Sequence, residues 1–258
     1  MLVWLEDLRL NAELTGPETA PPLVLIHGLG VDLRLWGALL HLLPGHRTLR
    51  LDLRGHGQTD TPPPPYAMGT MIRDVERMMQ HFALTDAVVV GAGEGGLVAQ
   101  GLAVKRLDLV RAMVLTGSGT RLGNSAWWKD YIVRLHDSGP DLDAEIAALL
   151  GPRWRDSAAS GLTSMMLACT RAEGWDGFAS AVANTDFYQT TATLTLPTLI
   201  LAGGDDRRVP PDMQRETADL VAGSQFQLLP GASHLAMLTH PQHFADTLLA
   251  FLTGIGHV

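Results

Sequence analysis

An acidic residue and a histidine each follow an apolar, strand-like segment in the last third of the chain. Asp206 comes after residues 198–201, and His234 comes after residues 226–229. A carboxylate that hydrogen-bonds an imidazole orients the ring and stabilises its protonated form. We therefore predict that Asp206 and His234 form a general-base pair, in which the histidine moves the proton.

The nucleophile that such a pair usually serves is missing. Residues 88–96 run from a β-branched strand through a glycine turn into a helix. A turn of the form G-x-S-x-G presents a serine at the tip of the strand, but the central position here is Gly93. Gly91 and Gly95 have no side chains to obstruct so tight a turn. Because Gly93 offers neither hydroxyl nor thiol, ordinary covalent esterase catalysis at this turn is excluded.

The same glycines also spell G-x-G-x-x-G, the pattern of a dinucleotide-binding loop. That pattern belongs to an N-terminal strand and needs an acidic residue about twenty positions later, at the end of a second strand. Asp108 has nearly that spacing, but it precedes the next strand instead of ending it. We therefore expect no nucleotide and no other cofactor.

Two further loops are expected to border the substrate. In the segment His27-Gly28-Leu29-Gly30, which directly follows an apolar run, the glycines let backbone amides point at a ligand oxygen. His27 and Gly28 are therefore candidate substrate-binding residues. Ser118 follows the predicted strand 112–115 and is a further candidate near the pocket.

A parallel sheet is predicted to position these segments. Short, mostly apolar runs of the kind found in strands covered on both faces alternate with amphipathic helical stretches. Near the N-terminus, apolar and polar residues alternate around residues 6 and 7, which predicts an antiparallel hairpin. The predicted strands are residues 2–5, 8–14, 23–26, 49–53, 87–90, 112–115, 198–201 and 226–229, and the clearest helices between them are 68–82 and 97–104.

The segment between the sixth and seventh predicted strands is too long for a loop. Its helical pieces, most clearly 144–150 and 163–170, predict an inserted helical cap over about residues 120–190 within a single domain of residues 1–258. Trp127 and Trp154 in this segment either line a pocket or fill a small helical core. Arg134 either grips a substrate carboxylate or faces solvent.

The amino-acid composition limits the classes of partner that the chain is expected to bind. The chain carries 27 acidic and 19 basic side chains, a net charge of -8 without a basic cluster, which argues against nucleic acid and membrane as partners. Cys169 is the single cysteine, and no helix face carries ligands spaced for a metal, so we expect neither disulfide nor metal site. Acidic residues interrupt the N-terminus before an apolar signal core, which indicates a cytoplasmic protein. We expect a small-molecule substrate, and a homodimer remains open.

Taken together, these motifs resemble the α/β-hydrolase superfamily, most of all its members of the 3-oxoadipate enol-lactonase type. The resemblance implies an α/β-hydrolase fold: a mostly parallel eight-stranded sheet with an N-terminal antiparallel hairpin and an inserted helical cap. It also implies that the backbone amides of Leu29 and Glu94 form an oxyanion hole, and that Gly93 stands where the family has serine. It rests on His27-Gly28-Leu29-Gly30, Trp36, Asp52-Leu53-Arg54-Gly55-His56-Gly57, the Gly93 turn, Asp206 with Pro210, and His234 with Pro241.

Four functions are compatible with a triad that lacks its serine. We favour an enzyme in which His234 and Asp206 act as a base without a covalent step, in a lyase, decarboxylase, isomerase or cyclase reaction or in hydrolysis by water. A Ser-to-Gly inactivated variant of an enol-lactone or ester hydrolase comes next, followed by a catalytically silent small-molecule binder. A nucleophile from elsewhere, such as Ser118, comes last because it is not on the turn. Glu94 is either a second proton carrier or an acid favoured by the helix dipole.

Overall fold

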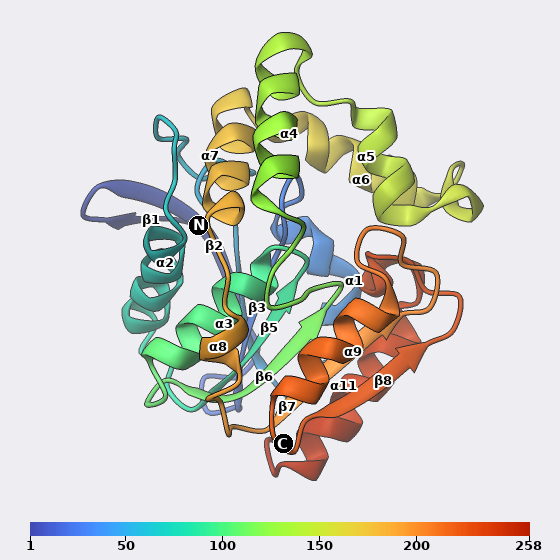
Figure 1. Cartoon of the computed structure of the whole chain (residues 1–258). Coiled ribbons are helices and arrows are strands. Elements are labelled where there is room, and N and C mark those ends of the chain that lie inside the picture. The colour runs from blue at the N-terminus through green and yellow to red at the C-terminus, as the bar shows by residue number, and fades with distance from the viewer.

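One sheet of eight strands runs through the molecule in the computed structural model, which describes residues 1–258 (Figure 1). The strand order is β1-β2-β4-β3-β5-β6-β7-β8. β1 and β2 form the predicted hairpin, β2 also runs antiparallel to β4, and all other neighbours are parallel, so the expected sheet is confirmed. The strands are β1 (Leu2–Leu5), β2 (Leu8–Thr15), β3 (Pro22–Ile26), β4 (Arg47–Leu51), β5 (Ala87–Ala92), β6 (Val110–Thr116), β7 (Thr198–Gly203) and β8 (Gln225–Leu229).

Strand β4 ends at Leu51, before the end that its apolar pattern predicts at residue 53. The Asp52 carboxylate accepts a hydrogen bond from the N–H of Gln58 at 2.9 Å. The N–H of Leu53 donates to Nε2 of His27 at 2.9 Å instead of to a neighbouring strand. These side-chain contacts draw the chain out of the sheet and form a loop beside the candidate site.

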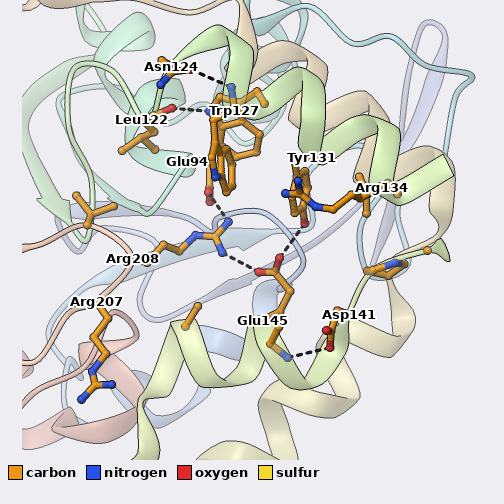
Figure 2. Close-up of a pocket in the computed structure, with 18 of the residues that line it drawn as sticks. Glu94, Leu122, Asn124, Trp127, Tyr131, Arg134, Asp141, Glu145, Arg207 and Arg208 are labelled. Atoms are coloured by element: carbon orange, nitrogen blue, oxygen red, sulfur yellow. Dashed lines mark hydrogen bonds and ion pairs between the residues drawn. The ribbon is translucent and has the colours of Figure 1, made fainter. Parts of the chain in front are cut away.

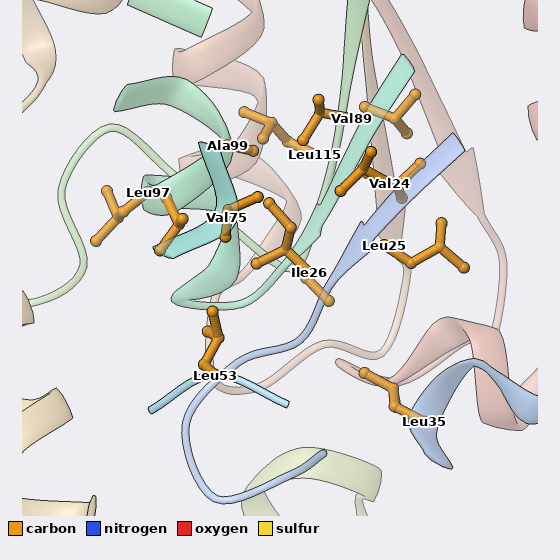
Figure 3. Packing of buried hydrophobic residues seen from close by; sticks show 14 of the residues in the cluster. Val24, Leu25, Ile26, Leu35, Leu53, Val75, Val89, Leu97, Ala99 and Leu115 are labelled. Carbon is orange, nitrogen blue, oxygen red and sulfur yellow. The ribbon is translucent and has the colours of Figure 1, made fainter. Parts of the chain in front are cut away.

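Helices cover both faces of the central strands. In Figure 3, Ile26 of β3 points toward Val75 and Ala99, whereas the adjacent Leu25 points the other way, toward Leu35. This alternation places the core on both sides of the sheet. None of the helices is both long enough and apolar enough to cross a membrane. The helices that cover the sheet are η1 (Leu33–Trp36), α1 (Gly37–Leu40), α2 (Met68–His81), α3 (Gly95–Lys105), α9 (Pro211–Leu220), α10 (Ala236–Thr239) and α11 (Pro241–Gly254).

The segment between β6 and β7 folds into helices, which we call the inserted helices. Figure 1 shows α4 to α7 grouped beyond one end of the sheet, while α8 lies beside α3. Polar residues fix where they begin: the side chain of Asn124 accepts the N–H of Trp127 at the start of α4, and Asp141 does the same for Ala144 at the start of α5. The inserted helices are α4 (Ser125–Ser138), α5 (Leu142–Leu150), η2 (Pro152–Trp154), α6 (Ala158–Cys169), α7 (Ala172–Ala183) and α8 (Tyr188–Thr191).

Candidate active site

The turn between β5 and α3 is tight enough to require glycines. Gly93 lies at its tip with φ of +54°, in the left-handed region where residues with side chains are strained. A Cβ atom on Gly95 would lie 2.3 Å from the carbonyl oxygen of His27, and one on Gly91 would lie 2.6 Å from Cα of Gly96. The strand therefore turns sharply into the helix, and no side chain projects from the tip of the turn.

Asp206 holds the ring of His234. Its carboxylate oxygens lie 3.0 and 3.2 Å from Nδ1 of His234, and both side chains are buried. The same carboxylate accepts hydrogen bonds from the N–H groups of Arg208 and Val209, each at 2.9 Å, and from Nε2 of Gln214 at 3.1 Å. Asp206 is thus fixed by its own loop and by α9, and it keeps Nδ1 of the imidazole occupied.

The other ring nitrogen of His234 faces the glycine tip. A Cβ atom on Gly93 would lie 3.1 Å from Nε2, and no protein group is hydrogen-bonded to this nitrogen. Gly117, with φ of +58°, also packs on the ring, because a Cβ atom there would lie 2.8 Å from Nδ1 and Cε1. The imidazole is held by close neighbours, and its free nitrogen points at Gly93, the predicted nucleophile position.

Gln214 is a site residue that the sequence did not reveal. It is fully buried on α9, and its Oε1 accepts the N–H of Gly117 at 2.9 Å. Its Nε2 donates to Asp206 and, at 2.7 Å, to the carbonyl oxygen of Val209. One amide therefore ties the orienting acid to the loop that packs on His234. Its sequence context is a mostly polar helix, which gives no sign of this role.

The expected oxyanion hole is already filled by the protein's own carboxylate. Oε2 of Glu94 accepts the N–H of Leu29 at 3.0 Å, and a Cβ atom on Gly28 would lie 2.8 Å from the same oxygen. Burial alone would raise the pKa of Glu94, but the charges of Arg208 and His234 and the N–H of Leu29 together lower it. An ionised side chain therefore occupies the place where a substrate oxygen was expected, and an oxyanion hole formed by the amides of Leu29 and Glu94 stays a prediction.

Arg208 holds Glu94 in that position. Its guanidinium lies 2.9 Å from Oε1 of Glu94 and 2.7 Å from Oε2 of Glu145, which comes from α5 (Figure 2). The hydroxyl of Tyr131 on α4 donates to Glu145 at 2.9 Å. Burial opposes the charge of Arg208, but the two carboxylates raise its pKa above the ordinary value. This buried network links the β5 and β7 loops to the inserted helices.

A cavity of about 770 Å³ lies next to this network, between the β7 loop and helices α4 and α5. Such a volume suits a small molecule. Trp127 and Tyr131 form one wall, with ring centroids 5.3 Å apart and ring planes 13° apart. Arg134 lines the cavity as well, and its guanidinium lies 5.9 Å from the centroid of the Tyr131 ring. Glu94 lines the cavity too, so it connects this space with the turn at Gly93.

The His27 side chain holds together the backbone at Gly28, after β3, and at Leu53, after β4. The ring is fully buried, with Nδ1 2.7 Å from the carbonyl oxygen of Gly28 and Nε2 accepting the N–H of Leu53. Burial lowers the pKa of His27. A neutral ring that donates from Nδ1 and accepts at Nε2 satisfies both contacts. Both nitrogens of His27 are therefore bonded to the backbone, and substrate contact by this residue stays a prediction.

Two other candidates lie away from the main cavity. Trp154 lines a separate hollow with Arg153 and Asp205, and its ring meets the edge of His240 at 5.7 Å between centroids. The Ser118 hydroxyl is buried without a hydrogen-bond partner and is packed against Gly96 of α3. It makes no hydrogen bond with Asp206 or His234, so it is not placed as a substitute nucleophile. No three His, Cys, Asp or Glu side chains converge as metal ligands.

Comparisons with known proteins identify the family and the fold. A family model described as alpha/beta hydrolase fold matches residues 21–241. The chain is 24% identical over 252 residues to 3-oxoadipate enol-lactonase 2 of Acinetobacter baylyi, covering 96% of this chain and 94% of the relative. It is 26% identical to a putative non-heme bromoperoxidase of Mycobacterium tuberculosis, and this match covers 92% of this chain and 95% of the relative.

Solved structures of hydrolases share the fold of this chain. The enol-lactonase of Burkholderia xenovorans superposes with a TM-score of 0.93 at 26% identity, covering 98% of this chain and 100% of that one. A hydrolase of Pseudomonas aeruginosa also superposes with a TM-score of 0.93, at 29% identity, and this match covers 98% of this chain and 97% of the hydrolase. The likeness therefore extends over essentially the whole chain, including the inserted helices.

Proposed function

The chain belongs to the alpha/beta hydrolase fold family, as an enzyme related to enol-lactonases and esterases, and we propose that it acts on a small ester, lactone or other carbonyl compound by non-covalent base catalysis. One observation carries the proposal. His234 is oriented by the buried Asp206, its Nε2 is free of protein partners, and the residue that it faces is Gly93. This arrangement supports a role for His234 as a base, since Gly93 offers it no hydroxyl to activate.

His234 can perform two related steps from this position. In hydrolysis, Nε2 takes a proton from water while the water oxygen bonds to the carbonyl carbon, and the imidazolium returns that proton to the departing alkoxide. In proton abstraction, Nε2 takes a proton from the carbon next to a carbonyl, and the electron pair moves into the enolate. Asp206 stabilises the imidazolium in both cases. General-base catalysis of this kind contributes about 10² to 10⁴ in rate.

The occupied hole favours a second candidate, a catalytically silent binder. An oxyanion is stabilised by preorganised donors, and the Leu29 N–H is bonded to Glu94 instead. In the favoured function Glu94 must leave Leu29 during the reaction. In a binder it stays, and the cavity beside Trp127 and Tyr131 holds the ligand without chemistry.

Replacing the base separates the two candidates. We expect His234→Ala to lower the turnover of a responsive ester or lactone by about a hundredfold or more, while its binding, followed by tryptophan fluorescence, changes little. His243→Ala, on an exposed surface of α11, is the matched control and should retain full turnover. Unchanged turnover in His234→Ala would rule out the base mechanism, and binding without turnover in the unmodified chain would support the binder.

A further inference from the structure

The buried N–H of Leu29 and the partly buried guanidinium of Arg208 converge on the carboxylate of Glu94 from different parts of the chain. The N–H of Leu29 binds one oxygen at 3.0 Å, and the guanidinium of Arg208 binds the other at 2.9 Å. The side chains of Glu94 and Arg208 are 3% and 14% exposed, so water does not readily replace either contact. Together the amide and the guanidinium form a receptor for one carboxylate group, and Glu94 is its present occupant.

The charges around Arg208 favour exchange over addition. Its guanidinium already meets two carboxylates, Glu94 and Glu145, within one buried cluster. A third carboxylate placed beside them would add an uncompensated buried charge, which is strongly unfavourable. A ligand carboxylate can therefore enter only as Glu94 leaves. A neutral carbonyl oxygen is a weaker acceptor than an ionised carboxylate, so it does not displace Glu94 equally well.

The surroundings indicate what the rest of the ligand is like. Glu94 and Arg208 both line the cavity of about 770 Å³, and the stacked rings of Trp127 and Tyr131 form its wall. Flat apolar groups bind well against such a wall. We propose that the Leu29 amide and Arg208 are a carboxylate-binding site, which Glu94 fills at rest and which a ligand carboxylate with a flat apolar body takes over. The proposal rests on the proposed function only in placing the ligand in this cavity.

Removing Glu94 should expose the site to a carboxylate from solution. In Glu94→Ala, benzoate at about a hundred times its Kd should raise Tm by about 5 to 10 °C, whereas the unmodified protein should shift by less than about 2 °C. Sodium chloride at the same ionic strength separates binding from a salt effect. Arg208→Gln combined with Glu94→Ala should lose the shift, because the charged half of the site is gone.

Glu94→Leu is the matched control, since it removes the same charge but fills the space. A benzoate shift in Glu94→Ala and none in Glu94→Leu supports the site. Equal shifts in both variants, or none in either, overturn it. If Glu94→Ala folds poorly, Glu94→Ser creates a similar space, and the urea midpoint with and without benzoate replaces Tm. These readouts require no turnover, so their failure leaves the His234→Ala comparison of the proposed function intact.

Discussion

We expect Gly93→Ser alone to give a far weaker esterase than Gly93→Ser combined with Glu94→Ala. The substitution returns a hydroxyl to the tip of the turn, next to Nε2 of His234. A Cβ atom at this position lies 3.1 Å from Nε2, so the imidazole has to move by a few tenths of an ångström to accept the new side chain. That adjustment is the same in the single and the double variant, so their comparison isolates the oxyanion hole.

The expected difference in turnover between the single and the double variant follows from the contact between Glu94 and Leu29. In the single variant, the Leu29 N–H still binds Glu94, so one oxyanion donor is missing. Loss of one such donor lowers turnover by about 10² to 10³. The double variant frees the amide and should be faster by that factor. Both variants should also unfold more easily, by about 1 to 3 kcal/mol, because position 93 has φ of +54°.

The assay is the release of p-nitrophenol from p-nitrophenyl acetate, with the pre-steady-state burst recorded. A burst reports an acyl-enzyme. We expect a burst in the double variant, its loss when His234→Ala is added, and a rate in the single variant lower by about two to three orders of magnitude. Equal rates in the single and double variants would show that Glu94 does not obstruct the Leu29 N–H.

Three further predictions test the scaffold around the site. Gln214→Leu should lower kcat about tenfold with little change in KM and should move the pH midpoint of turnover, because the residue orients the acid that serves His234. Burial lowers the pKa of His56 to about 3, so as the pH falls the unfolded chain binds a proton before the folded chain does. The free energy of unfolding should therefore decrease below about pH 6.5, by up to about 1.4 kcal/mol per pH unit. In urea unfolding measured over this pH range, His56→Gln should lack the part of the decrease that comes from His56. Gly95→Ala should destabilise the fold by about 2 to 3 kcal/mol, whereas the exposed helical Gly69→Ala should stabilise it by about 0.5 to 1 kcal/mol, both measured by urea unfolding.

The sequence could predict the sheet and the pairing of Asp206 with His234 because both depend on local patterns. Buried runs of β-branched residues became strands, and the positions of Asp206 and His234 after two neighbouring strands β7 and β8 placed them at one edge of the sheet. The glycine spacing around Gly93 likewise reflects backbone contacts that any side chain would block. Such features repeat within a few residues, so they can be read without the fold.

The contacts of Glu94 could not be predicted in this way. Its position at the start of α3 suggested either a proton carrier or a helix-terminal acid, but its two partners, Leu29 and Arg208, come from distant segments, and Arg208 in turn binds Glu145. Leu29 belongs to the loop after β3, Arg208 to the loop after β7, and Glu145 to an inserted helix. Only the folded arrangement shows that one guanidinium joins two carboxylates there. The contacts of Gln214 with Gly117 and Asp206 could not be predicted for the same reason.

The central claim is that His234 acts as a base without a covalent intermediate. The most direct test follows a panel of small esters, lactones and ketones by proton NMR in D₂O, with the unmodified protein and His234→Ala, while mass spectrometry monitors the protein. We predict a compound whose hydrolysis or carbon-bound proton exchange is accelerated by the unmodified protein and slowed at least about a hundredfold in His234→Ala, with no acyl adduct on the chain. Equal rates in the two proteins, or an adduct that forms and decays during turnover, would contradict the account.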